Sequence, residues 1–213
     1  MAGGALWRNH VLPFVVGRSL RQIILAAGAL LLLASGLFGG LERAEPDKLK
    51  TVKVGQTIDT GPFDLTVTKV GWAKQLGEEF RESEIGRYVV VYATVTSTEE
   101  NTVDGFVIRE ALRIRGLDDF AVNVGTDDLV ASEKADMNVV AVSDEARIDY
   151  LNPGLTYNVE YVWEQSAAKP LPNSIELTFY GHGFRQSNID EQENWFDRFE
   201  LATGSFPVTE LEP

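Results

Sequence analysis

Cysteine is absent from this 213-residue sequence, and histidine occurs only at His10 and His182. Without cysteine the chain forms no disulfide and carries no lipid-modified cysteine, so its fold rests on a hydrophobic core. A zinc site is disfavoured, because such sites draw mainly on cysteine and histidine ligands. The sequence also lacks the G-x-S-x-G, phosphate-loop and dinucleotide-binding patterns. We therefore expect no catalytic activity and no cofactor.

Basic residues are scarce relative to acidic ones, and the formal net charge is −13. The first 41 residues hold three arginines and no acidic residue, so the rest of the chain holds 16 basic and 32 acidic residues, a net charge of −16. Such a domain repels the phosphates of nucleic acid, which makes a nucleic-acid partner improbable. A cationic partner is compatible with this charge but is not required by it.

Charged residues are also missing from one long apolar run, residues 23–41 (IILAAGALLLLASGLFGGL). As a helix this run would extend for roughly 28 Å, close to the thickness of the bilayer hydrocarbon core. The sequence therefore predicts one transmembrane helix. Arg8, Arg18 and Arg21 precede it and acidic residues follow it, so the N-terminus is expected in the cytoplasm and the C-terminal domain outside.

A cleaved signal peptide is the alternative interpretation, because basic residues followed by an apolar run fit both. The run is long, however, and residues 42–44 (ERA) place a charge where a cleavage site needs a small residue. We therefore favour an uncleaved signal anchor. Within the span, Gly36, Gly39 and Gly40 are candidate positions for packing against a neighbouring helix, although glycine is common in membrane helices generally.

Beyond the span, apolar and polar residues alternate with the period of two that is typical of β-strands. The pattern is clearest in residues 63–67, 87–98, 155–163 and 175–179. The first half of 87–98 is apolar on both faces, so we expect it to be covered on both sides. We count about seven to nine short strands separated by turn signals such as Asn-Pro-Gly at 152–154. This pattern predicts an all-β sandwich.

The sequence thus divides the chain into four parts. They are a cytoplasmic segment at 1–22, the span at 23–41, a charged linker at 42–50, and an extracytoplasmic sandwich at 51–213 with a C-terminal extension from about residue 182.

Three segments together resemble a known family. They are VKVGQTIDTGPFDLTVTKV at 52–70, GRYVVVYATVTST at 86–98 and LNPGLTYNVEYVWEQ at 151–165. In order and spacing they are similar to the bacterial immunoglobulin-like domains of unknown function that are grouped with the immunoprotective extracellular antigen family. The resemblance covers roughly residues 50–181. It implies an immunoglobulin-like antiparallel β-sandwich outside the membrane, without known catalytic residues.

The chain departs from that family in three respects. It has Ser97 where members often have asparagine at the end of the central strand. Many members are lipoproteins, and this chain lacks the cysteine that lipid modification requires. Residues 182–213 lie outside the resemblance, so any property specific to this protein is expected there.

The C-terminal tail holds the candidate partner contact. Asp190 is a potential N-cap for a short helix that carries Trp195, Phe196 and Phe199, and residues 206–211 are a potential last strand. These three aromatics are candidates for an exposed contact with a partner. The alternative is that the helix docks on the sandwich and buries them.

Other residues suggest chemistry only weakly. His182, between two glycines, is the one histidine of the outer domain and the only candidate for a hydrolase site, although a loop histidine of this kind is more often incidental. Tyr157, Tyr161 and Trp163 suggest a carbohydrate platform, but their two-residue spacing favours the core-facing side of a strand. Acidic residues offer oxygen ligands for calcium without the spacing of a calcium loop. They are Asp104, Asp118, Asp119, Asp127, Asp128 and Asp136.

The leading hypothesis is a non-catalytic, membrane-anchored binding or accessory protein that contacts another envelope protein or a transporter. The alternative is a stand-alone sensor or solute-binding module for a cation or a cell-wall glycan. Sandwich folds host many functions, so the fold alone does not decide between these two.

Overall fold

The computed structural model describes residues 24, 25, 28, 49–143, 145–186 and 193–211. The chain forms two compact units, Met1–Asp47 and Lys48–Pro213. In the first unit the described residues, 24, 25 and 28, are helical. The rest of the predicted span, including Gly36, Gly39 and Gly40, lies outside the described residues. Among the residues that are described, no helix is long and apolar enough to cross a membrane.

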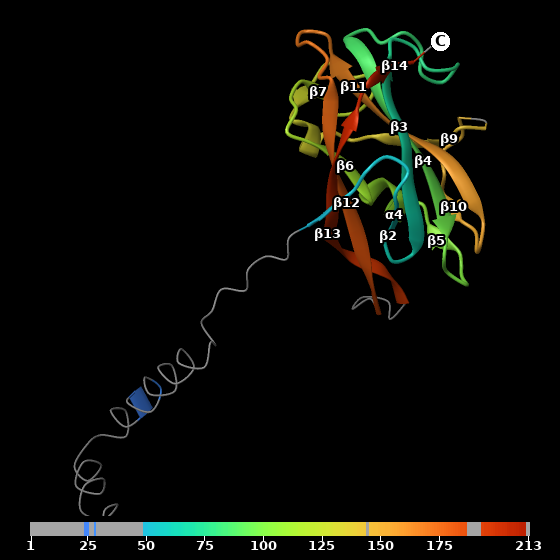
Figure 1. Cartoon of the computed structure of the whole chain (residues 1–213), viewed down its shortest axis with the longest axis vertical. Helices are drawn as coiled ribbons and strands as arrows, with labels where there is room; N and C mark the ends of the chain where they lie inside the picture. Colours follow the sequence, from blue (N-terminus) through green and yellow to red (C-terminus); the bar gives the residue numbers. More distant parts are fainter. Residues whose placement is uncertain (1–23, 26–27, 29–48, 144, 187–192, 212–213) are drawn as a thin grey trace, which may run out of the picture. The chain divides into compact units, whose positions relative to one another are not determined.

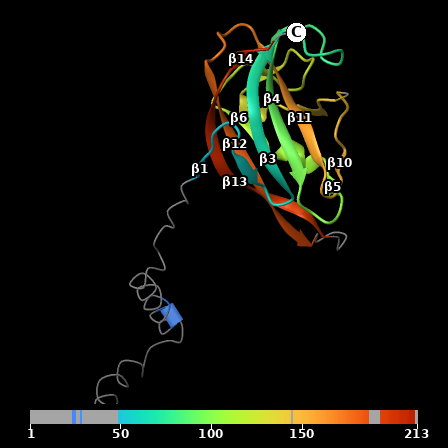
Figure 2. The same ribbon diagram turned by 45° about the vertical axis from the view of Figure 1, so that its right-hand side comes forward.

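The second unit is a β-sandwich of two layers (Figures 1 and 2). The smaller sheet has four strands in the order β1 (Lys50–Thr51), β13 (Glu193–Pro207), β12 (Ser174–Gln186) and β6 (Leu112–Arg115). The larger sheet has the order β14 (Thr209–Glu210), β3 (Phe63–Ala73), β4 (Gly86–Ser97), β11 (Thr156–Ser166), β7 (Phe120–Ala121) and β8 (Leu129–Val130). Within the larger sheet, β2 (Thr57–Asp59) also pairs with β3, and β9 (Asn138–Ala141) pairs with β11.

The core lies between the two sheets and is built from the inward residues of the alternating strands. On β12 and β13 the inward pairs are Ile175 with Phe206 and Phe179 with Ala202. On β11, Tyr161 and Trp163 are fully buried. The predicted all-β sandwich is therefore confirmed, and so is the inward orientation of Tyr161 and Trp163.

A second apolar cluster covers the outer face of the larger sheet. It holds Tyr88 and Val90 of β4 and Val162 of β11, beneath Phe80 of the loop that joins β3 to β4 and Leu211 from the C-terminal end. This explains why the first half of β4 is apolar on both faces, as the sequence predicted.

Two pairings are parallel, although the sequence led us to expect an antiparallel sandwich. β1 runs parallel to β13, and β14 runs parallel to β3. Each of these edge strands has two residues, which is too short to leave a pattern in the sequence. The remaining pairings in the two sheets are antiparallel.

A short helix also went unpredicted. This helix, α4 (Phe106–Glu110), lies between β5 (Val103–Asp104) and β6 and buries Val107 and Ile108. β5 pairs with β10 (Tyr150–Leu151), and a 3-10 turn, η1 (Ser132–Lys134), follows β8. Five helical residues are too few to show a helical period in the sequence.

The C-terminal tail differs most from its prediction. Trp195, Phe196 and Phe199 lie on a strand, β13, and not on a short helix. β13 is a central strand of the smaller sheet, between β1 and β12, so its residues from Ala202 to Pro207 belong to the sandwich and not to an extension of it. Asp190, the predicted helix cap, lies outside the described residues.

Candidate binding surfaces

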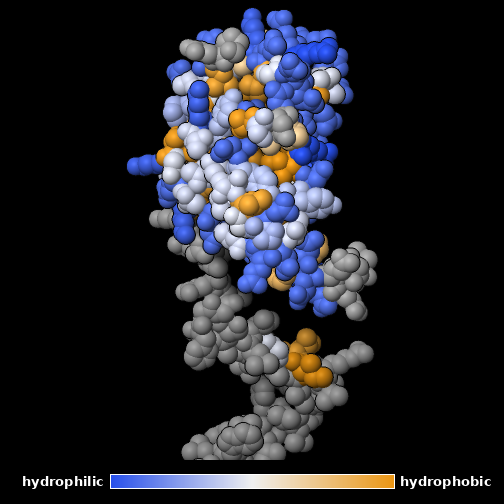
Figure 3. All heavy atoms as spheres, turned by 90° about the vertical axis from the view of Figure 1, so that its right-hand side faces the viewer, coloured by the Kyte–Doolittle hydropathy of each residue, from blue (hydrophilic) through white to orange (hydrophobic). Residues whose placement is uncertain are grey.

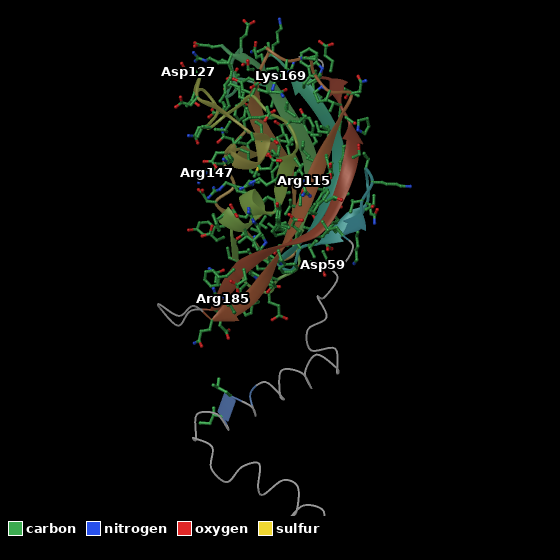
Figure 4. All side chains as sticks on the ribbon, turned by 90° about the vertical axis from the view of Figure 1, so that its left-hand side faces the viewer. Asp59, Arg115, Asp127, Arg147, Lys169 and Arg185 are labelled. Carbon is green, nitrogen blue, oxygen red and sulfur yellow. The ribbon has the colours of Figure 1, made fainter. Side chains whose placement is uncertain are left out.

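The β12–β13 hairpin extends beyond the rest of its sheet. β6 pairs with β12 over Glu176–Phe179, and β1 pairs with β13 at Ala202–Thr203. Beyond these pairings the two strands continue as a two-stranded ribbon, residues 180–186 and 193–201, which we call the distal ribbon. Its far end projects past the neighbouring strands in both ribbon views (Figures 1 and 2). Arg185 marks this end, far from Asp127 and Lys169 at the opposite end of the sandwich (Figure 4).

The distal ribbon concentrates aromatic side chains that are only partly covered. The rings of Phe184 and Trp195 lie 5.2 Å apart between centroids. Phe184 and Phe199 are exposed over 52% and 50% of their surfaces, respectively. The face seen in Figure 3 is mostly hydrophilic, with several hydrophobic patches among the polar side chains. All three predicted contact residues therefore lie on this one ribbon, together with Phe184, which the sequence did not single out.

Trp195 is held in place by a close contact with a glycine. A Cβ atom on Gly61, in the turn between β2 and β3, would lie 2.7 Å from Cζ3 of Trp195. Gly61 also has φ = +104°, a conformation that only glycine adopts without strain. Trp195 thus packs partly against the sandwich, as the docked alternative expected, while Phe184 and Phe199 remain exposed.

Two arginines lie against aromatic rings of the ribbon. The guanidinium of Arg185 is 4.8 Å from the ring centroid of Phe196, and that of Arg198 is 4.4 Å from that of Tyr180. Arg185 also donates to Asp197, and this bond lowers the pKa of the Asp197 carboxyl. Arrays of arginine and aromatic residues are typical of the energetic centres of protein interfaces.

The backbone edge of the ribbon is poorly suited to pairing with another strand. The register shifts between Phe179 and Tyr180 and again between Gly181 and Gly183, and Asp197 has φ = +48°. Bulges and charged residues on an edge are the usual means by which proteins prevent strand addition. Recognition at this ribbon therefore depends on its side chains.

His182 lies at the base of the ribbon and not in a loop, as its flanking glycines had suggested. It is part of β12, its main-chain N–H donates to the carbonyl of Thr60 at 2.9 Å, and its side chain is 5% exposed. Neither ring nitrogen has a hydrogen-bond partner among the described residues. Burial lowers the pKa of His182; the nearby Glu110 opposes this shift and Arg198 adds to it.

This burial predicts a dependence of stability on pH. Because the folded-state pKa is below the unfolded value of about 6.5, the unfolded chain binds more protons between these two values. Above about pH 6.5, His182 therefore makes its full contribution to the free energy of unfolding. This contribution is lost as the pH falls towards the folded-state pKa. The free energy of unfolding then changes by at most about 1.4 kcal/mol per pH unit.

The measurement is chemical unfolding of the wild type and of His182→Leu between pH 7.5 and 5.5. The wild type should lose stability across this range, and the variant should lose less, because leucine does not titrate. His10 is present in both proteins, so any effect of it cancels in the difference. Parallel pH profiles for the two proteins would contradict the burial of a neutral His182.

A groove of about 510 Å³ is the second candidate surface. It lies between α4 and β9, and its walls come from the β3–β4 loop, α4, the segment before β9 and the residues after it. Arginines and carboxylates share this groove with apolar side chains. The lining includes Phe80, Phe106, Arg109, Glu110, Arg113, Asp136, Met137, Val139, Val140, Glu145 and Arg147.

The acidic residues suggested for calcium are dispersed. Asp118 and Asp119 lie 3.5 and 3.1 Å from the amino group of Lys169. Asp104 caps the start of α4 by accepting the N–H of Phe106 at 2.8 Å, and Asp136 lines the groove. In the described part of the chain, no three acidic or histidine side chains come together in a cluster suited to a metal ion.

The aromatic residues suggested as a carbohydrate platform are not on the surface. Tyr161 and Trp163 are fully buried, with ring centroids 6.3 Å apart, and the hydroxyl of Tyr161 donates to the carbonyl of Ile108. Tyr157 is half-buried and packs against the same core. The two-residue spacing of these aromatics therefore marks the core-facing side of β11, which is the interpretation that the sequence favoured.

No protein-family model matches the chain, and no curated protein matches it either. Several solved structures are similar at low identity. An uncharacterized β-sandwich protein from Clostridium difficile is 14% identical, with a TM-score of 0.42, over 72% of this chain and 97% of that one. A putative lipoprotein from Staphylococcus aureus is 12% identical, with a TM-score of 0.40, over 78% and 97%. A secreted protein from Mycobacterium tuberculosis is 12% identical, with a TM-score of 0.36, over 76% and 99%. Similarities at this level assign neither a family nor a function.

Proposed function

We propose that this chain is a non-catalytic accessory protein of the bacterial cell envelope that binds another envelope protein or a transporter through its distal ribbon. The observation that carries the proposal is the pair of half-exposed phenylalanines, Phe184 and Phe199, on a ribbon that also holds Trp195 and two ring-contacting arginines. Exposed apolar groups gathered at one place, with a polar surround, are typical of protein contact sites.

The proposal places the domain outside the cytoplasm. The apolar run at 23–41 would remain as an uncleaved anchor, with the arginines before it in the cytoplasm. An anchored domain meets its partners within the membrane plane, where the effective concentration is high and a modest contact area suffices. The net charge of −16 beyond the span favours a partner whose surface around the contact is basic or uncharged. The immunoglobulin-like domain that the family resemblance implies would fit this role.

The experiment is co-purification from gently solubilised membranes with the double variant Phe184→Ser, Phe199→Ser. Truncating a central aromatic residue typically costs an interface about 2 kcal/mol or more, so the pair should abolish recovery of the partner. Leu129→Ser is the matched control, because Leu129 is 44% exposed and lies on β8, two residues after Asp127, which is at the end of the sandwich opposite Arg185 (Figure 4).

The control should recover the partner as the wild type does, and all three proteins should unfold at similar temperatures. A ribbon variant that retains the partner at wild-type yield would contradict the proposal. So would a wild-type protein that is consistently a partner-free monomer.

A further inference from the structure

The groove between α4 and β9 contains an arginine whose guanidinium has no hydrogen-bond or ion-pair partner among the described residues. Arg109 is half-buried, and its guanidinium carbon lies 6.0 Å from the ring centroid of Phe106. The Arg109 side chain forms no hydrogen bond and no ion pair with any of the described residues. A half-buried guanidinium with five free donors is well suited to a planar oxyanion such as a carboxylate.

The neighbouring arginine, Arg113, bonds to the main chain of Arg109 and forms an ion pair with Glu110. Arg113 donates to the carbonyls of Arg109 and Leu112, and to Oε1 of Glu110 at 3.1 Å. Burial lowers the pKa of Arg113, although its carboxylate neighbours oppose this shift. The main chain at Arg109 is thereby held in place, so the side chain of Arg109 is presented from a fixed point on α4.

The groove also carries opposite charge, which limits the kind of anion that it accepts. The Asp136 carboxylate forms no hydrogen bond or ion pair within the described residues. The Glu145 carboxylate accepts the main-chain N–H of Glu79 at 2.8 Å and also lines the groove. These carboxylates repel an ion that carries only negative charge. They attract an ammonium group.

The remaining wall is apolar. Phe80, Met137 and Val140 line the groove, and its volume of about 510 Å³ is in the range of sites for small organic ligands. We infer that this groove binds a short zwitterionic peptide or amino acid, with its carboxylate on Arg109, its ammonium group towards Asp136 and Glu145, and its apolar side chain on the Phe80–Val140 wall. Glu110 of the groove also pairs with Arg198 of the distal ribbon, but none of the three groups invoked here lies on that ribbon, so the inference does not depend on the proposed partner.

The test is calorimetric titration of the full-length protein in detergent micelles with the dipeptide alanyl-phenylalanine. Two derivatives isolate the charges: the C-terminal amide lacks the carboxylate, and the N-acetyl form lacks the ammonium group. We expect saturable binding of the dipeptide and affinities at least about tenfold lower for each derivative, the usual effect of losing one charge-assisted hydrogen bond.

Variants assign the contacts. Arg109→Gln should weaken dipeptide binding at least about tenfold. Arg115→Gln is the control and should not affect binding, because Arg115 is exposed at the end of β6 and lies outside the groove. Asp136→Asn should weaken binding of the dipeptide but not of its N-acetyl form, a difference that misfolding would not produce. The inference is overturned if no probe binds saturably at millimolar concentration. It is also overturned if either derivative binds as well as the dipeptide, or if Arg109→Gln leaves the affinity unchanged.

Discussion

Replacement of Trp163 by alanine is expected to lower the free energy of unfolding by about 3–5 kcal/mol, the usual cost of removing a large buried aromatic side chain. Trp163 is fully buried between the sheets and stacks on Tyr161 at 6.3 Å between centroids. Truncation leaves a cavity next to β4, because the buried ring is removed while its strand stays paired with β4 at Val89. Urea-induced unfolding of the purified protein measures this loss.

Two further variants show whether the loss arises from the core. Trp163→Phe should cost much less, since Nε1 of Trp163 has no hydrogen-bond partner among the described residues. Tyr150→Ala removes an aromatic side chain that is 61% exposed and should change stability by less than about 1 kcal/mol. A Trp163→Ala protein as stable as the wild type would mean that this ring is not part of the core, and would reopen its role as a surface platform.

Replacement of Gly105 by alanine is the second large expected effect, because the added methyl group has no space. Gly105 precedes α4, and its N–H donates to the carbonyl of Asp149 at 2.7 Å. A Cβ atom there would lie 2.8 Å from the carbonyl carbon of Asp149 and still closer to the carbonyl oxygen of Ile148. These obstructing atoms are backbone, so we expect a loss of about 2–3 kcal/mol, towards the upper end for overpacking.

Gly183→Ala is the matched control for this substitution. The nearest atom to a Cβ at Gly183 is Cβ of Asp197 at 3.8 Å, an ordinary contact distance. Thermal unfolding should therefore show a clear loss for Gly105→Ala and little change for Gly183→Ala. Equal stabilities of the two variants would contradict the close packing of Gly105 against Ile148 and Asp149, in the segment before β10.

The long strands were predictable from the sequence because their side chains alternate without interruption. β3, β4 and β11 each bury one face against the core, and the period of two is visible in residues 63–67, 87–98 and 155–163. The turn at 152–154 was predictable because proline and glycine restrict its backbone. β14 lies within residues 206–211, where the sequence indicated a last strand. The parallel pairings of β1 and β14 were not predictable, because they are decided by where the folded sandwich brings the chain.

The error at the C-terminal tail has a specific cause. Two register shifts interrupt the β12–β13 pairing, so the period of two breaks where Trp195, Phe196 and Phe199 occur. The remaining spacing of these aromatics is close to that of a helix face, which is why a helix was expected. His182 was misjudged for a related reason: its glycine neighbour Gly181 is needed for packing, since a Cβ there would lie 2.8 Å from the side chain of Leu201.

The groove was not predictable from any local pattern. Its residues come from five segments, near Phe80, Arg109, Val124, Asp136 and Arg147, which are separated along the sequence. Glu110 lies at its border and accepts from both Arg113 of the groove and Arg198 of the distal ribbon, at 3.1 and 2.8 Å. The two candidate surfaces therefore share one carboxylate, which only the folded chain brings into place.

The proposed function depends above all on the location of the sandwich domain, and the absence of cysteine makes this location directly measurable. Ser205→Cys places one thiol on an exposed position of β13, and Ser19→Cys places one before the apolar run. A membrane-impermeant maleimide is applied to intact cells, and the membranes are then isolated. We predict that both proteins sediment with membranes, that Ser205→Cys is labelled at once, and that Ser19→Cys is labelled only after permeabilisation. Protection of Ser205→Cys in intact cells, or recovery of the domain in the soluble fraction of the cytoplasm, would contradict the proposed function.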